Sequence, residues 1–220
     1  MSTGVANVEE VLKLLLETVK SNAAKNEVKA NISEIPVGIS NRHVHLSEKD
    51  LECLFGKGYE LTRIKDLSQP GQYACKEVVT LCGPRGPIEK VRILGPVRSK
   101  SQVEVLAGDC RKLGISSHVK LSGDLAGTPG ITIVGPKGTV QISEGVMVAQ
   151  RHIHMTPEEA KVLGVCDGDI VSIKIDGLRG GVFNNVAIRA NDTSGLECHL
   201  DVEEANAMGI NPKSKITIVK

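Results

Sequence analysis

The 220-residue chain repeats part of itself, and this duplication constrains its fold more than any other feature. Residues 39–50 (ISNRHVHLSEKD) return as residues 148–159 (VAQRHIHMTPEE). Residues 79–88 (VTLCGPRGPI) return as residues 131–140 (ITIVGPKGTV). An internal repeat of this kind predicts two structurally similar units, one from each half of the chain.

A shorter unit also recurs, consisting of a strand, a polar cap, a short helix that ends in glycine and a second strand. It occupies residues 105–121, 156–173 and 200–219. Thr156 stands three residues before Glu159 and Ser47 three residues before Asp50, a spacing close to that of the helix-capping box. Short helices should therefore follow both copies of the longer repeat.

The composition favours a core built from strands. Aromatic residues make up only 2% of the chain, whereas glycine occurs 23 times. Such a core must consist mainly of Val, Ile and Leu on short strands joined by glycine turns. The sequence therefore predicts a mostly β fold with short α-helices. We expect two tandem small β-barrels, over residues 37–127 and 128–220, each capped by short helices.

Residues 1–36 differ from the rest of the chain. An apolar stripe with helical spacing predicts an amphipathic helix over residues 8–19, formed by Val8, Val11, Leu12, Leu15 and Val19. The polar residues 21–34 that follow predict a linker. The pattern leaves two interpretations open: a docking peptide on a tether, or a helix that packs against its own protein.

Charge and apolar runs argue against several classes of protein. The chain has 27 Lys and Arg and 26 Asp and Glu, a net charge of +1, whereas nucleic-acid binders are usually basic. No apolar run approaches the roughly 18 residues of a membrane helix, and the N-terminus lacks the pattern of a secretory signal. The six cysteines include no CxxC pair. We therefore expect a cytoplasmic protein with reduced thiols and no membrane or nucleic-acid partner.

Four of the six histidines form two His-x-His pairs, His43 with His45 and His152 with His154. In a strand, residues i and i+2 point to the same face, so each pair supplies half of a metal site. One such pair could arise by chance on a solvated strand. Two copies at equivalent positions of a duplication indicate function, and zinc is the metal expected first for imidazole ligands without redox chemistry.

Each pair needs a further ligand. His199 precedes the third cap unit as the His pairs precede theirs, which makes it the natural third ligand; the alternative is an ordinary half-exposed strand residue. Glu104 stands between Val103 and Val105 in an otherwise apolar strand. The residues alone leave open whether Glu104 is a ligand.

The combination of motifs resembles the PduL family of phosphotransacylases, the phosphate propanoyltransferases associated with bacterial microcompartments. The resemblance covers about residues 36–220 and is carried by residues 40–47, 67–72, 98–104, 150–154 and 197–200. It implies two β-barrels with a dinuclear zinc site between them. It also implies the reaction of a short-chain acyl-CoA, propanoyl-CoA or acetyl-CoA, with phosphate to give acyl phosphate and CoA.

The resemblance further implies roles for individual residues. One zinc ion would be held by His43, His45 and Glu104, and the other by His152, His154 and His199. Arg98 would bind phosphate and act in catalysis together with Ser122, and Ser40 would lie near the substrate. Members of this family often carry a short N-terminal helix that targets them to the microcompartment lumen, so residues 8–19 are expected to contact the shell.

Chemistry fits this expectation, because a zinc ion and a guanidinium can orient phosphate for direct attack in a ternary complex. The main alternative is a zinc-dependent hydrolase of esters or thioesters, which would need no phosphate. A second alternative is a metal-binding shell component without activity. The sequence leaves open the preference between acetyl and propanoyl groups, the residues that bind CoA, and whether the chain forms a homo-oligomer.

Overall fold

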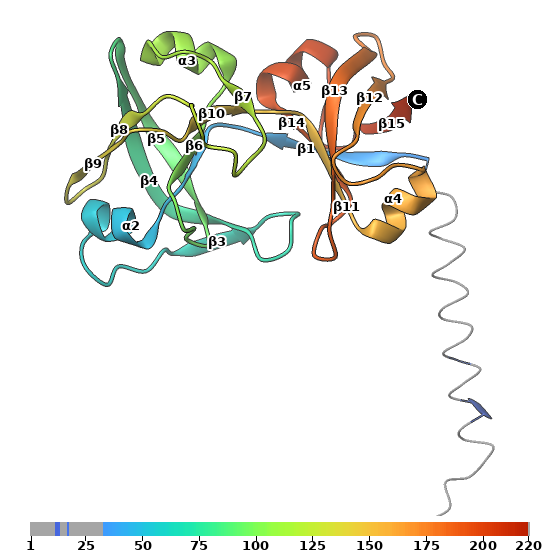
Figure 1. Ribbon diagram of the computed structural model, residues 1–220, viewed down its shortest axis with the longest axis horizontal. Coiled ribbons are helices and arrows are strands. Elements are labelled where there is room, and N and C mark those ends of the chain that lie inside the picture. Colours follow the sequence, from blue (N-terminus) through green and yellow to red (C-terminus); the bar gives the residue numbers. More distant parts are fainter. Residues whose placement is uncertain (1–11, 14–16, 18–32, 220) are drawn as a thin grey trace, which may run out of the picture.

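The computed structural model describes residues 12–13, 17 and 33–219. Most of the predicted helix over residues 8–19 lies outside the described residues. Within them, the chain forms four short helices and two β-sheets (Figure 1). The predicted mostly β class with short helices is confirmed. None of the helices in this part of the chain is long and apolar enough to cross a membrane.

One sheet closes into a six-stranded barrel in the order β1-β14-β11-β13-β12-β15. Its strands are β1 (Ile35–Ser40), β11 (His152–Met155), β12 (Ile170–Ile175), β13 (Gly181–Ala190), β14 (Glu197–Asp201) and β15 (Lys215–Val219). Its core consists of aliphatic side chains such as Ile153, Ile173 and Ile188, all at most 1% exposed. Branched aliphatic side chains, which pack well on a pleated surface, thus fill the core in place of aromatic residues.

The other sheet has nine strands and curls without closing, in the order β7-β10-β6-β2-β5-β4-β8-β9, with β3 paired to β4. Its strands are β2 (His43–His45), β3 (Arg63–Asp66), β4 (Tyr73–Gly83), β5 (Gly86–Gly95), β6 (Gln102–Glu104), β7 (Val119–Lys120), β8 (Ile131–Val134), β9 (Thr139–Ile142) and β10 (Val146–Ala149). A second aliphatic core lies on this sheet and includes Leu46, Ile93 and Ile133.

The two repeats exchange strands. In Figure 1 the blue strand β1, from the first repeat, lies among the orange and red strands of the barrel, where it pairs in parallel with β14. Its counterpart β10, from the second repeat, pairs in parallel with β6 of the nine-stranded sheet. Sheet membership therefore differs from the predicted division at residues 127 and 128. A local repeat records which residues are strands, but not which sheet each strand joins.

The second sequence echo has a different meaning from the first. Residues 79–88 and 131–140 contribute to the β4–β5 and β8–β9 hairpins, which lie in the same sheet. β4 pairs with β8 in antiparallel register, with Leu81 opposite Ile133. This echo therefore relates two neighbouring hairpins, rather than the two sheets.

The helices are α2 (Glu48–Phe55), α3 (Ala107–Leu113), α4 (Pro157–Leu163) and α5 (Val202–Met208). Most helix ends lie at the predicted signals, but α3 begins after Leu106, which has no polar side chain to cap it, and α2 ends at Gly56 outside the left-handed conformation. The Thr156 hydroxyl accepts a hydrogen bond from the Glu159 backbone N–H, and the Ser47 hydroxyl does the same for Asp50. Gly164, like its counterparts after α3 and α5, takes the left-handed conformation that ends the helix.

Candidate metal centre

The strand exchange brings both His-x-His pairs to the junction of the two sheets. Residues 41–42 lead from β1 of the barrel to β2 of the nine-stranded sheet, and residues 150–151 lead from β10 of that sheet to β11 of the barrel. Each pair thus begins where the chain crosses between the sheets. Both pairs line a single cavity of about 550 Å³, a size typical of a small-ligand site.

The first cluster consists of His43, His45 and Glu104. β2 and β6 are antiparallel with His43 opposite Glu104, a register that places their side chains on the same face. The His43 Nε2 atom lies 3.5 Å from a carboxylate oxygen of Glu104. The three potential ligand atoms lie within 4.8 Å of one another, close enough to share one metal ion.

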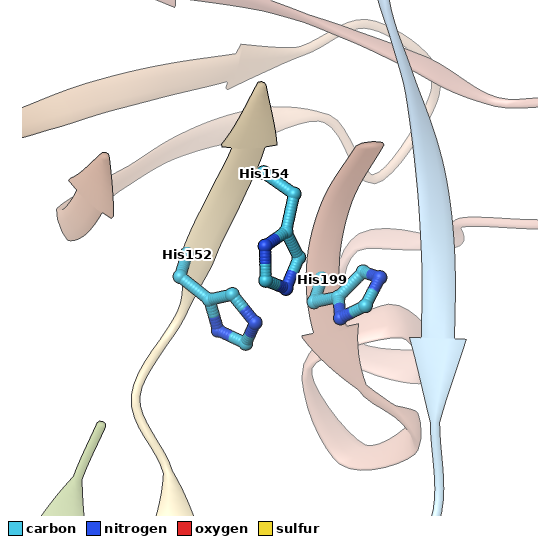
Figure 2. Close-up of side chains that lie close together, drawn as sticks. All are labelled: His152, His154 and His199. Atoms are coloured by element: carbon cyan, nitrogen blue, oxygen red, sulfur yellow. The ribbon is translucent and has the colours of Figure 1, made fainter. Parts of the chain in front are cut away.

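The second cluster consists of His152, His154 and His199. β11 and β14 are antiparallel with His152 opposite His199, which repeats the arrangement of the first cluster. Figure 2 shows the three imidazoles gathered on one side of these two strands. Their ring centroids lie 4.8–4.9 Å apart in all three pairs. The structure thus brings Glu104 to one His-x-His pair and His199 to the other.

Backbone carbonyls fix the tautomer of one histidine in each cluster. The His43 Nδ1 atom lies 2.8 Å from the Asn41 carbonyl oxygen, and the His152 Nδ1 atom lies 2.8 Å from that of Gln150. A carbonyl can only accept, so Nδ1 must carry the proton in each ring. The Nε2 lone pair is then available to a metal ion, as is usual for metal-binding histidines.

The other histidine of each pair has a ring nitrogen without a partner. The Nδ1 atoms of His45 and His154 are buried and have no hydrogen-bond partner among the described residues. A buried polar atom left in this state costs about 1–3 kcal/mol. The same atom is orphaned at equivalent positions of the two repeats, and the donor set consists of imidazoles and a carboxylate. Both features fit a pair of metal sites.

Electrostatics keeps most of these imidazoles neutral. Burial, followed by the charge of His43, lowers the pKa of His45 to about 3. Burial and the neighbouring imidazoles lower the pKa of His154 to about 3 and that of His152 to about 4. Since a metal binds the unprotonated ring, these three residues are ready to ligate at neutral pH.

Glu104 and His43 form a tightly coupled buried pair. Burial alone would raise the pKa of the Glu104 carboxyl, but the adjacent His43 outweighs it and holds that pKa well below its usual range. Burial would likewise lower the pKa of His43, but Glu104 raises it above its usual value. The first cluster therefore holds an anionic ligand, which the second cluster lacks.

Arg98 enters the cavity beside the first cluster. Its guanidinium donates to the Ser122 hydroxyl at 3.1 Å, and the same hydroxyl accepts from the Gln102 amide at 2.8 Å. Ser122 thus holds Arg98 in place. Ser40 also lines the cavity, and its hydroxyl lies 3.4 Å from the Leu200 carbonyl oxygen. The predicted site residues Arg98, Ser122 and Ser40 all face the same space as the six candidate ligands.

Comparison with known proteins assigns the chain to a family. A family model described as phosphate propanoyltransferase matches residues 36–211. This chain belongs to the phosphate propanoyltransferase family. The phosphate propanoyltransferase of Rhodobacter capsulatus is 48% identical over 208 residues, which cover 94% of this chain and 96% of the relative. Those of Thermotoga maritima and Salmonella typhimurium are 53% and 51% identical over 187 residues, covering 84% of this chain and 89% of each relative.

Family membership supports a phosphotransacylase activity, and therefore an acyltransferase. The resemblance drawn from the histidine motifs is confirmed. Sequence reasoning missed Arg189, whose positive charge in the cavity is of interest because a phosphotransacylase binds anionic substrates. Arg189 lies opposite His154 in the β11–β13 register and lines the cavity. It forms no side-chain hydrogen bond or ion pair within the described part of the chain. The signal in the sequence that could have identified Arg189 is an arginine at the end of the otherwise apolar stretch 186–189 (VAIR).

Two other arginines that lie close to the site in sequence have structural partners. Arg42 pairs with Asp109 at 2.6 Å, and Arg151 pairs with Glu204. Because the charges of Arg42 and Arg151 are already paired with carboxylates, these side chains are less available to a phosphate group than Arg189.

Cys198 is excluded as the acyl-accepting nucleophile of this phosphotransacylase. Its side chain is fully buried in the barrel core, on the strand face opposite His199. Burial raises the pKa of its thiol to about 12, so the thiolate is not formed at neutral pH.

Proposed function

We propose that this protein transfers a short acyl group, propanoyl or acetyl, between coenzyme A and phosphate at a dinuclear zinc site. The observation that carries the proposal is the shared cavity, which brings together two three-residue clusters and Arg98. A single metal cluster would fit many hydrolases. Two clusters beside an arginine offer separate places for a carbonyl and for an anionic nucleophile.

Each cluster takes its three ligands from one half of the chain. His43, His45 and Glu104 would hold one zinc ion, and His152, His154 and His199 the other, each leaving positions for substrate or water. Zinc at these positions would polarise the thioester carbonyl and stabilise the thiolate as it departs.

Arginine side chains orient the phosphate. Arg98 is held by Ser122, so its remaining N–H groups can bind phosphate oxygens in a fixed direction. Arg189 supplies a second positive charge in the same cavity. Both arginines favour phosphate over water as the nucleophile, because water gains nothing from a guanidinium clamp.

The proposed reaction is a direct displacement. An oxygen of hydrogen phosphate forms the new C–O bond with the acyl carbon, the C–S bond breaks, and the thiolate of CoA leaves and takes up the proton that the phosphate gives up. None of the described serines in the cavity is hydrogen-bonded to an imidazole, and the Cys198 thiol is buried. An acyl group carried on serine or cysteine would need one such activated nucleophile, so transfer in a ternary complex fits these residues better.

We also propose that residues 8–19 dock this enzyme to the shell of a bacterial microcompartment, so that it acts in the lumen of that compartment in the bacterial cytoplasm. The proposal rests on the amphipathic pattern of these residues, the polar linker after them and the family resemblance. Propanoyl phosphate formed in the lumen would then be close to other enzymes enclosed there.

The reaction is tested by CoA release from propanoyl-CoA, with and without phosphate, on protein of known zinc content. We expect turnover that needs both phosphate and zinc, and that is lost in His154→Ala. Glu158→Gln is a matched control, since Glu158 is exposed on α4 and away from the cavity. Phosphate-independent release of CoA would instead establish a zinc hydrolase.

A further inference from the structure

The third ligand of each cluster is hydrogen-bonded by the side chain two residues before it. The Gln102 amide nitrogen donates to the Glu104 carboxylate at 2.6 Å. The His199 Nε2 atom lies 2.6 Å from the Glu197 carboxylate. The two supporting residues are equivalent by register, because Gln102 lies opposite His45 and Glu197 lies opposite His154.

In each pair the supporting residue is chemically matched to its ligand. The ionised Glu104 can only accept hydrogen bonds, and it receives one from an amide. His199 has a nitrogen that can donate, and it faces a carboxylate, which can only accept. The carboxylate therefore fixes the proton of His199 on Nε2. Nδ1 is then the lone-pair atom, and one ring nitrogen of His199 faces the other two imidazoles in Figure 2.

Charge is matched as well as hydrogen bonding. The first cluster holds one carboxylate as a ligand, Glu104. The second cluster holds three imidazoles, and its carboxylate, Glu197, lies directly behind one of them. Each site thus has one negative charge close to the position of the metal. An imidazole backed by a carboxylate is also the more basic ligand.

Both supporting residues are themselves fixed. Gln102 also donates to the Ser122 hydroxyl at 2.8 Å, and its amide oxygen accepts from the Gly123 N–H at 2.9 Å. Glu197 accepts a hydrogen bond from the Ser68 hydroxyl. Ser68 lies in the connection between β3 and β4 of the nine-stranded sheet. A residue beside one sheet thus fixes Glu197, which belongs to strand β14 of the barrel.

The backbone next to Glu197 leaves room for its carboxylate. Gly38 lies opposite His199 in the β1–β14 register. A Cβ atom at residue 38 would lie 2.6 Å from the Glu197 carboxyl carbon, which is too close for any real contact. A glycine at this position therefore allows the carboxylate to reach His199.

We propose that Gln102 and Glu197 are positioning residues that adjust the two metal sites separately, Gln102 through Glu104 and Glu197 through His199. This inference rests on the proposed function, since it requires that the clusters hold metal. Removing such a partner usually weakens metal binding 10–100-fold. The loss should be confined to the site that the residue supports.

The test measures zinc affinity for each site by chelator competition, together with the visible absorption of the Co²⁺-substituted protein. Glu197→Gln keeps the shape of the side chain and removes its charge. We expect one of two ions to bind at least about tenfold more weakly, with a changed Co²⁺ spectrum and the other ion unaffected. Gly38→Ala should weaken the same ion, because it displaces the carboxylate without altering its chemistry. Glu158→Gln is the control.

The reciprocal variant is Gln102→Glu, which places a second carboxylate beside Glu104. We expect it to weaken the ion that Glu197→Gln leaves unaffected. A wild-type protein that binds no zinc would remove the metal from the proposed function. A wild-type protein with two zinc ions, and unchanged affinities and spectra in Glu197→Gln and Gly38→Ala, would overturn this inference alone.

Discussion

Acidification of the metal-free protein should reduce its stability well above the pH at which carboxylates titrate. His45 and His152 are 2% and 7% exposed, with pKa values of about 3 and about 4. In the unfolded chain both imidazoles have a pKa of about 6.5. As the pH falls below that value, the unfolded state takes up protons that the folded state refuses. The free energy of unfolding therefore falls with pH.

The size of the effect follows from the linkage relation. At pH 5 an unfolded imidazole lies about 1.5 pH units below its pKa, which corresponds to about 2 kcal/mol for each residue. His45 and His152 together then contribute a loss of about 4 kcal/mol between pH 7 and pH 5. The half-buried His154 adds to this loss, whereas His43, with its raised pKa, opposes it. We expect a net loss of about 3–5 kcal/mol, a large part of the 5–15 kcal/mol typical of folded proteins.

Urea unfolding at pH 7, 6 and 5, in the presence of a chelator, measures this loss. The variant His152→Asn removes one of the titrating groups, so its stability should fall less steeply over the same range. A free energy of unfolding that is equal at pH 7 and pH 5 would refute the reasoning. It would mean that the folded protein protonates these imidazoles as easily as the unfolded chain does.

Three further predictions address the core, the cavity and the N-terminus. Ile153→Ala should lower the free energy of unfolding, measured with urea, by about 2–5 kcal/mol, because Ile153 is fully buried in the barrel core. Its zinc content should not change, because the two neighbouring ligands face the other way. Arg189→Gln should raise the KM for phosphate about 10–100-fold, the value of one charge-assisted hydrogen bond, at unchanged zinc content; an unchanged KM would exclude Arg189 from phosphate binding. A fusion of residues 1–25 to a fluorescent protein should form foci in cells that assemble shells, and diffuse fluorescence would count against shell docking.

The histidines could be predicted because their geometry is local. Side chains at i and i+2 share a face of any strand, whichever strands lie beside it. His199 could also be inferred, since it precedes a helix cap as the other histidines do. Glu104 could not be derived in this way, because an acidic residue in a short apolar strand is a ligand only if the partner strand places a histidine opposite it.

The remaining features depend on strand pairing, which the sequence does not reveal. Gln102, Glu197 and Arg189 each gain their place from register against a histidine strand. The exchange of β1 and β10 between the sheets could not be predicted either. The local sequence pattern of each strand would be the same in either sheet. Which sheet the strand joins depends on the edges that the other strands leave unpaired.

The strand exchange also explains why an arginine precedes each histidine pair. Arg42 immediately precedes β2 and binds Asp109 in α3, the helix that follows the Glu104 strand. Arg151 immediately precedes β11 and binds Glu204 in α5, the helix that follows the His199 strand. Each ion pair therefore joins the strand of two ligands to the element next to the third. Backbone pairing of β2 with β6 and of β11 with β14 sets the register of the ligands, and each ion pair adds a side-chain contact beside it, where the chain crosses between the sheets.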